Sequence, residues 1–281
     1  MPADLKPLLA DLTAESAEVT ALLARLTPAD WTRPTPAAGW SVTDQVTHLA
    51  YFDDVTLLSL TDPDRFRAEA QTLAADGDDY PDRVAAAHRH LDGATVATWF
   101  GTAREALLDG YARCDPAARL PWFGPDMGVA SSVTARLMET WAHGQDIADT
   151  LGVDRPATAR LRHVAHIGIR ALPYTYLVNG QAVPERPIRV ELTAPDGDVW
   201  TWGPAGDTDR VAGTALDFCL AVTQRRHLSD TGLVVAGPAA NQWMAIAQAF
   251  AGPPGPGRPP REAPGDPAGP GRAPRAEKAP Q

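Results

Sequence analysis

Four long segments with a helical spacing of apolar residues occupy about the first 150 residues of this 281-residue chain. Each segment repeats apolar residues every three or four positions, as helices do when they bury one face. Loops rich in proline and glycine separate the segments, and Ser41 with Asp44 has the spacing of a capping box at the start of the second one. We expect these helices at residues 3–26, 41–60, 81–113 and 131–151. Together they predict a four-helix bundle over residues 1–154.

The pattern changes after residue 154, where short runs of β-type residues alternate with helical ones. We expect helices at residues 157–178, 211–226 and 239–250, and strands at residues 188–192, 199–202 and 232–236. Short strands mixed with helices predict a small α+β domain over residues 155–251. The chain is therefore predicted to be an α+β protein of two domains.

The last thirty residues, 252–281, contain ten prolines and six glycines and almost no large apolar side chain. Such a segment cannot bury enough surface to offset its ordering entropy, so we expect a disordered tail. The tail has a net charge of +2, which leaves −12 for the rest of a chain whose total is −10. This acidic body argues against nucleic acid and anionic membranes as partners.

The sequence also bears on the compartment. No apolar run reaches the length of a transmembrane helix, and the N-terminus lacks the apolar core of a signal peptide. The two cysteines, Cys114 and Cys219, are isolated in sequence and form no CxxC motif. These features favour a reducing cytoplasm and argue against a thiolate zinc site or a redox pair. Whether the protein is a monomer or a homodimer stays open.

Glu139 and His143 are four residues apart in the last of the four predicted bundle helices. Residues at that spacing lie one above the other on a helix, so a carboxylate and an imidazole can bind one ion. His48, in the middle of the second predicted helix, offers a third ligand. Two histidines and one carboxylate leave a coordination position open, which is typical of catalytic zinc sites. We therefore predict that His48, Glu139 and His143 bind a divalent ion, with zinc as the first candidate.

These residues also have simpler interpretations. Glu139 and His143 could form a solvated pair on the helix surface, and His48 could be a histidine packed in the core. Apolar residues cover much of the circumference of the helix around Glu139, so its carboxylate is expected to point into the bundle. A buried carboxylate is costly unless it is paired or bound to metal. This cost favours the metal site.

Further polar residues lie near the predicted ligands. Asp146 is three residues beyond His143 on the same helix face, where it can orient a metal-bound imidazole or bind a polar group of a substrate. Asp44 can do the same for His48, although capping explains it more simply. One face of the predicted helix at 157–178 carries His163, His166, Arg170 and Tyr174. That face either closes over the mouth of the bundle and binds an acidic ligand, or it makes a polar contact between the domains.

Arg225 and Arg226 end the predicted helix at residues 211–226. A guanidinium group binds carboxylates through two parallel hydrogen bonds, so these arginines can recognise an acidic ligand at the cleft between the domains. The alternative is that they complement the negative end of the helix dipole.

A mid-helix histidine after Gly39-Trp40-Ser41-Val42, followed about ninety residues later by Glu139, His143 and Asp146, resembles the DinB-like metal-binding bundles. More closely, the chain is similar to the mycothiol-dependent maleylpyruvate isomerases, which add a small, sterol-carrier-like α+β domain to such a bundle. The resemblance covers about residues 5–250. It implies that His48, Glu139 and His143 are metal ligands and that mycothiol is the thiol co-substrate.

An open metal site supports two kinds of reaction. The ion can lower the pKa of bound water, as in hydrolases and lyases, or it can deprotonate an exogenous thiol, as a thiol-dependent isomerase or transferase requires. No HExxH motif is present and neither cysteine lies in a ligand motif, so a reacting sulfur would come from a small molecule. The resemblance favours mycothiol as that thiol and a small electrophile as its substrate. A third interpretation is a non-catalytic binding protein whose metal only stabilises the bundle.

Overall fold

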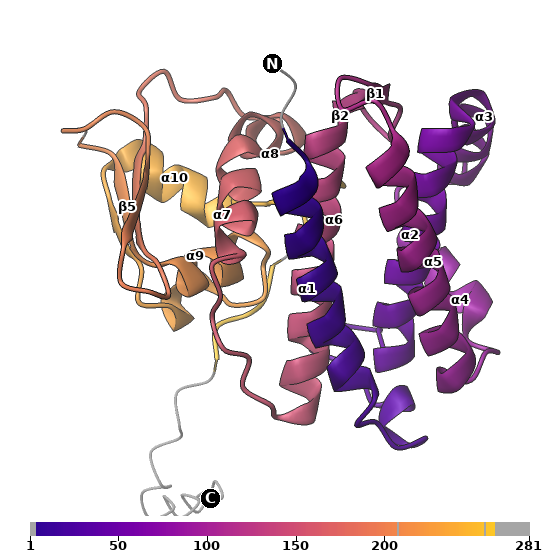
Figure 1. Ribbon diagram of the computed structural model, residues 1–281. Helices are drawn as coiled ribbons and strands as arrows, with labels where there is room; N and C mark the ends of the chain where they lie inside the picture. Colours follow the sequence, from indigo (N-terminus) through magenta and orange to yellow (C-terminus); the bar gives the residue numbers. More distant parts are fainter. Residues whose placement is uncertain (1–3, 207, 256, 262–281) are drawn as a thin grey trace, which may run out of the picture.

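The four longest helices lie side by side in the N-terminal half of the molecule (Figure 1). The computed structural model describes residues 4–206, 208–255 and 257–261. The four helices are α1 (Lys6–Leu23), α2 (Val42–Thr61), α5 (Gly93–Arg113) and α6 (Val129–Leu151). Their apolar faces are fully buried against one another at Leu12, Val46, Leu107 and Leu137. The predicted four-helix bundle is confirmed.

The third predicted helix, at residues 81–113, is wrong as a single element. It consists of α4 (Tyr80–His88) and α5, and a new helix begins because the Asp92 carboxylate accepts a hydrogen bond from the Thr95 N–H at 2.8 Å. The sequence pattern also missed α3 (Pro63–Ala74), which is mostly polar and buries only Phe66. Its start is marked by the cap Asp62 and by Pro63 in the first turn. A short 3-10 turn, η1 (Asp30–Thr32), precedes α2.

The C-terminal half is a small α+β unit, as predicted. Its helices are α7 (Leu161–Arg170), α8 (Leu172–Val178), α9 (Ala215–Val222) and α10 (Pro238–Ile246), with the 3-10 turn η2 (Leu228–Asp230). Its strands are β3 (Arg189–Thr193), β4 (Val199–Trp202), β5 (Arg210–Thr214) and β6 (Val234–Ala236), in the order β4-β3-β5-β6. β3 and β5 pair in parallel and the other pairs are antiparallel. A separate antiparallel pair, β1 (Arg119–Leu120) and β2 (Met127–Gly128), precedes α6.

Two predicted helices of this half are corrected by the structure. The helix predicted at 157–178 breaks at Ala171 into α7 and α8, and Pro173 lies in the first turn of α8. The helix predicted at 211–226 begins with β5, where Val211 and its neighbours pair with β3 on one side and with β6 on the other. Thr214 then caps α9, because its hydroxyl accepts a hydrogen bond from the Asp217 N–H at 3.0 Å.

One continuous hydrophobic cluster joins the two halves. It includes Leu137 and Trp141 of α6, Val164 of α7, Phe218 of α9 and Trp243 of α10, all of them buried. In Figure 1, α7 lies beside α6, between the bundle and the sheet. The second half is therefore held against the helix that carries Glu139 and His143.

The first residues of the predicted tail contact the body of the molecule. The Tyr174 hydroxyl donates to the Gly252 carbonyl at 3.1 Å and accepts from its N–H at 2.9 Å. The Arg258 guanidinium pairs with Asp146, and the Arg261 N–H donates to Asp230 at 2.9 Å. The predicted disorder of the tail is therefore corrected for residues 252–255 and 257–261, which contact the body. Residues 262–281 lie outside the described residues.

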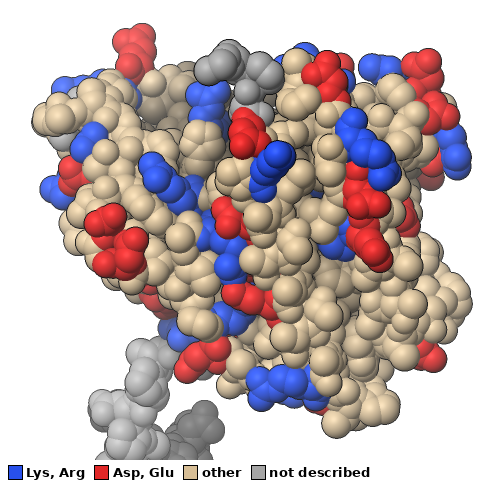
Figure 2. Space-filling model, viewed as in Figure 1, with Lys and Arg blue, Asp and Glu red and all other residues tan. Residues whose placement is uncertain are grey.

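The surface in Figure 2 mixes acidic and basic side chains on the face shown. Among the described helices, none is both long and apolar enough to cross a membrane.

Candidate metal centre

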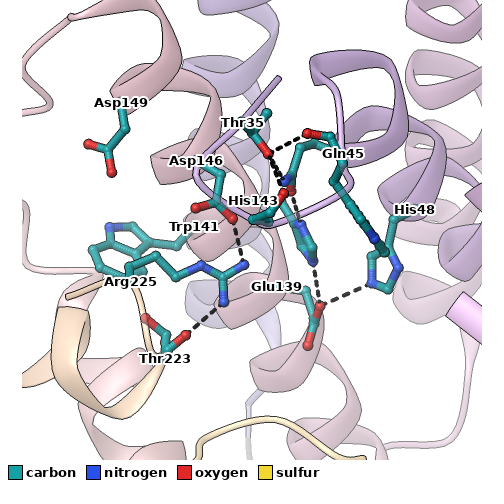
Figure 3. A network of polar contacts seen from close by, with 12 residues as sticks. Thr35, Gln45, His48, Glu139, Trp141, His143, Asp146, Asp149, Thr223 and Arg225 are labelled. Carbon is teal, nitrogen blue, oxygen red and sulfur yellow. Dashed lines mark hydrogen bonds and ion pairs between the residues drawn. The ribbon is translucent and has the colours of Figure 1, made fainter. Parts of the chain in front are cut away.

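His48 of α2 and the pair Glu139 and His143 of α6 meet inside the bundle (Figure 3). One ligand atom from each residue lies within 4.8 Å of the other two. The Oε2 atom of Glu139 is 3.2 Å from Nε2 of His48 and 3.1 Å from Nε2 of His143. The structure therefore brings together the three residues that the sequence predicts as ligands.

The spacing of these atoms fits a metal ion. Ligand atoms at about 2.0–2.1 Å from a tetrahedral zinc ion lie roughly 3.3 Å from one another, close to the two nitrogen–oxygen separations at Glu139. The donor set of two imidazoles and one carboxylate also suits zinc and neighbouring divalent metals. The side chains are mostly withdrawn from solvent, with exposed fractions of 13% for His48, 20% for Glu139 and 10% for His143.

Gln45, which the sequence interpretation missed, orients His143. Its Oε1 atom bonds Nδ1 of His143, and its side-chain amide donates to the Thr35 hydroxyl at 2.9 Å. With an acceptor at Nδ1, the proton of the imidazole sits there and the lone pair of Nε2 is directed at the site. A signal was available, because Gln45 precedes His48 by three residues and shares its helix face.

Trp40 covers the two imidazoles on one side. Its ring centroid is 5.9 Å from that of His143 in a stacked arrangement and 5.4 Å from that of His48. Its indole N–H donates to Asp82 at 2.6 Å, which holds the ring in place. Trp40 also lines a cavity of about 930 Å³ between the ends of α1 and the starts of α2 and α5, whose lining residues do not include the three ligands.

The electrostatics keep His48 and Glu139 in the protonation states that a metal requires. Burial, followed by the neighbouring His143, lowers the pKa of His48 to about 4. Burial would raise the pKa of Glu139, but its contacts with His143 and His48 outweigh burial and hold this pKa well below its usual value. At neutral pH His48 is therefore neutral and Glu139 is ionised, and both can act as ligands.

Comparisons with known proteins find matches in sequence and in fold. Residues 12–148 match the family model described as the mycothiol maleylpyruvate isomerase N-terminal domain. Residues 184–236 match a model described as wyosine base formation. Two proteins of Mycobacterium tuberculosis, from the strains Oshkosh and H37Rv and both described as uncharacterized, are 47% identical over 257 residues, which is 91% of this chain and 100% of each relative.

The chain belongs to the same family as these two proteins. Its N-terminal half is a domain of the mycothiol maleylpyruvate isomerase type, as the resemblance implied. A crystal structure of the mycothiol-dependent maleylpyruvate isomerase has the same fold, with a TM-score of 0.56 at 13% identity over 83% of this chain and 93% of that chain. A histidine-to-alanine mutant of it gives a TM-score of 0.57 at 14% identity over the same shares.

Within this family fold, Asp146 is paired with arginines. It is fully buried, and its carboxylate accepts from Nη2 of Arg225 at 3.0 Å (Figure 3). The same carboxylate also binds Arg258. The role of orienting His143, which was one expectation for Asp146, is taken by Gln45. Asp44 forms the predicted capping box with Ser41 and pairs with Arg89.

Arg225 and Arg226 do reach the bundle, but not from the end of a helix. They follow α9 in a turn in which Gln224 has a φ of 58°, which is unusual for a residue other than glycine. Arg226 binds Asp149 in bidentate fashion, at 2.5 and 2.8 Å. Both arginines therefore link the second half to the part of α6 that follows His143.

The predicted helix face at 157–178 is divided by the break at Ala171. His163 bonds Asp11 of α1 at 2.8 Å, which is one of the polar contacts between the halves. Arg170 is exposed at the end of α7. Tyr174 of α8 bonds the backbone of Gly252, and within the described part of the chain it makes no hydrogen bond to the three ligands. Tyr80 stacks on Phe123 with ring centroids 4.8 Å apart, and burial raises the pKa of its hydroxyl to about 12.

Proposed function

We propose that the protein is a divalent-metal enzyme that uses an exogenous thiol, mycothiol, to isomerise a small electrophilic substrate or to transfer the thiol to it. The observation that carries this proposal is the convergence of His48, Glu139 and His143 with ligand spacing in a fold of this family. We take zinc as the native ion and the cytoplasm as the compartment. A divalent ion held by these side chains would supply the positive charge that deprotonates a coordinating thiol.

The protein's own cysteines cannot supply the reacting sulfur at this site. Cys219 is buried in α9, where burial raises the pKa of its thiol well above the usual value. Cys114 follows α5 and its thiol donates to the Tyr111 carbonyl at 3.2 Å. Neither belongs to the group of ligand atoms. This distribution supports a small-molecule thiol.

The residues around the three ligands are proposed to orient them and to bind the thiol and the substrate. Gln45 holds the proton of His143 at Nδ1, and Trp40 shields the imidazoles on one side. Arg225 and Arg226 are proposed to recognise a carboxylate of mycothiol or substrate. In the metal-bound enzyme they would bind this carboxylate either in place of Asp146 and Asp149 or in addition to them. Tyr174 and Arg170 are proposed as further contacts on the side of the second domain, and Asp146 as the group that positions Arg225.

Cobalt substitution tests the proposal. Metal analysis of the purified protein should give one divalent ion per chain, and His143→Ala should reduce it to a trace. Adding mycothiol to the cobalt-loaded protein should produce a sulfur-to-cobalt charge-transfer absorption band, whereas its S-methylated form should not. Binding of metal with no spectral change on adding the thiol would remove the thiol from the reaction and leave metal-activated water as the explanation.

A further inference from the structure

A cluster of three ionised side chains lies in the core of the bundle. Asp53 of α2 pairs with Arg104 of α5 and with Arg136 of α6, and the exposed fractions of the three side chains are 0%, 4% and 3%. Arg104 binds Asp53 through Nε at 2.6 Å and Nη2 at 3.0 Å, and Arg136 binds it through Nε at 3.0 Å. None of the three is a ligand of the predicted metal site.

The outer contacts of this cluster end next to the metal ligands. Nη2 of Arg136 donates to the carbonyl of Leu49 at 3.2 Å, and Leu49 directly follows His48. Nη1 of Arg104 donates to the hydroxyl of Thr140 at 3.0 Å, and Thr140 directly follows Glu139. The same Nη1 atom also donates to the Ser16 hydroxyl of α1 at 2.6 Å. The cluster thereby connects all four helices of the bundle beside the ligands.

Stability alone explains such a cluster poorly. Burying ionised groups costs several kcal/mol of desolvation each, and well-packed apolar residues in their place are often at least as stabilising. Two arginines and one aspartate also leave one positive charge in excess, and Glu139, one helical turn after Arg136, carries the opposite charge. Unlike apolar packing, the hydrogen bonds of the cluster are directional, so each of them fixes the position of one helix relative to another.

We propose that Asp53, Arg104 and Arg136 are positioning residues that fix α2 against α6 and thereby set the separation between His48 and the pair Glu139 and His143. This inference rests on the proposed metal site. A tetrahedral ion tolerates ligand displacements of only a few tenths of an ångström. A shift of α2 along α6 would therefore weaken metal binding even where the bundle stays folded.

The variant R136K tests this inference, because lysine keeps the charge but lacks the planar, forked guanidinium through which arginine binds Asp53 and the Leu49 carbonyl. We expect zinc affinity, measured by competition with a chromophoric chelator, to fall about 10- to 100-fold. The visible absorption of the cobalt-loaded variant should change in energy and intensity, and the rise in Tm on adding zinc should shrink. The variant T140V keeps every charge and removes the two hydrogen bonds of the Thr140 hydroxyl, the one accepted from Arg104 and the one donated to the Arg136 carbonyl. It should show a smaller change in the same direction and decides the test if R136K does not fold.

The variant R160K is the matched control. Arg160 also binds a fully buried carboxylate, that of Glu15, at 2.7 Å, but its contacts do not involve residues next to the ligands. We expect R160K to lower Tm with and without zinc alike and to leave zinc affinity and the cobalt spectrum unchanged. Equal zinc affinities in R136K, T140V, R160K and wild type would overturn the positioning role while leaving the metal site intact. Failure of the wild-type protein to bind zinc or cobalt would overturn the proposed function, and with it this inference.

Discussion

At the scale of single residues, the metal centre depends on His48 staying neutral in a buried position. The pKa of His48 falls from 6.5 to about 4 on folding, so between these pH values the unfolded chain binds a proton that the folded chain does not. The contribution of His48 to the unfolding free energy of the metal-free protein should therefore be fully present above pH 6.5. It should be lost as the pH falls toward 4, which lowers the unfolding free energy by up to about 3 kcal/mol. Urea denaturation of the metal-free protein at pH 7.5, 6, 5 and 4.5 measures this slope. His48→Gln should flatten it, whereas His90→Gln, which changes an exposed histidine, should not. An unchanged slope in His48→Gln would assign the pH dependence to other groups.

At the scale of elements, the start of α2 determines where His48 stands. The Ser41 hydroxyl accepts from the Asp44 N–H at 3.2 Å, and the Asp44 carboxylate accepts from the Ser41 N–H at 2.8 Å, so both partners of the capping box are satisfied. Ser41→Ala removes half of this box and should cost about 1 kcal/mol of unfolding free energy. Ser131→Ala, at an exposed position of α6, should change it little. Thermal and urea denaturation of the two variants are the measurement, and equal stabilities would mean that the cap contributes nothing. Because His48 lies in the second turn of α2, Ser41→Ala should leave zinc bound.

At the scale of the whole molecule, the segment after α10 joins the two halves. Arg258 binds Asp146, which is fully buried on α6, and Gly252 exchanges two hydrogen bonds with Tyr174 of α8. A chain ending at residue 251 loses these contacts and leaves Asp146 with Arg225 alone, so its unfolding free energy should fall by at least about 1 kcal/mol. A chain ending at residue 261 keeps them and should melt like the full chain. Calorimetry of the three lengths compares them directly. Equal Tm values for all three would show that the segment adds no stability.

Much of this protein could be predicted from the sequence, because the relevant interactions act within one or two helical turns. Apolar periodicity identified the four bundle helices, the Ser41 and Asp44 pair marked the start of α2, and the i,i+4 spacing placed Glu139 and His143 on one face. The predicted helix boundaries were wrong where a capping residue interrupts a continuous apolar pattern, and a helix was missed where few apolar residues mark it. The cap at Asp92 ends one helical run and begins another although the apolar pattern continues, and α3 has almost no buried face to reveal it.

Only the tertiary structure decided what depends on residues far apart in the chain. Residues 210–214 are a strand because β3 and β6 pair with them on both sides, and the same residues without these partners have a helical pattern. Gln45 reaches His143, and Arg225 reaches Asp146, across 98 and 79 positions of sequence. The cluster of Asp53, Arg104 and Arg136 likewise exists only where three helices meet. A sequence determines which side chains one helix presents on each face, whereas the partner of each face is selected by packing among all the helices, and this packing has no local signature.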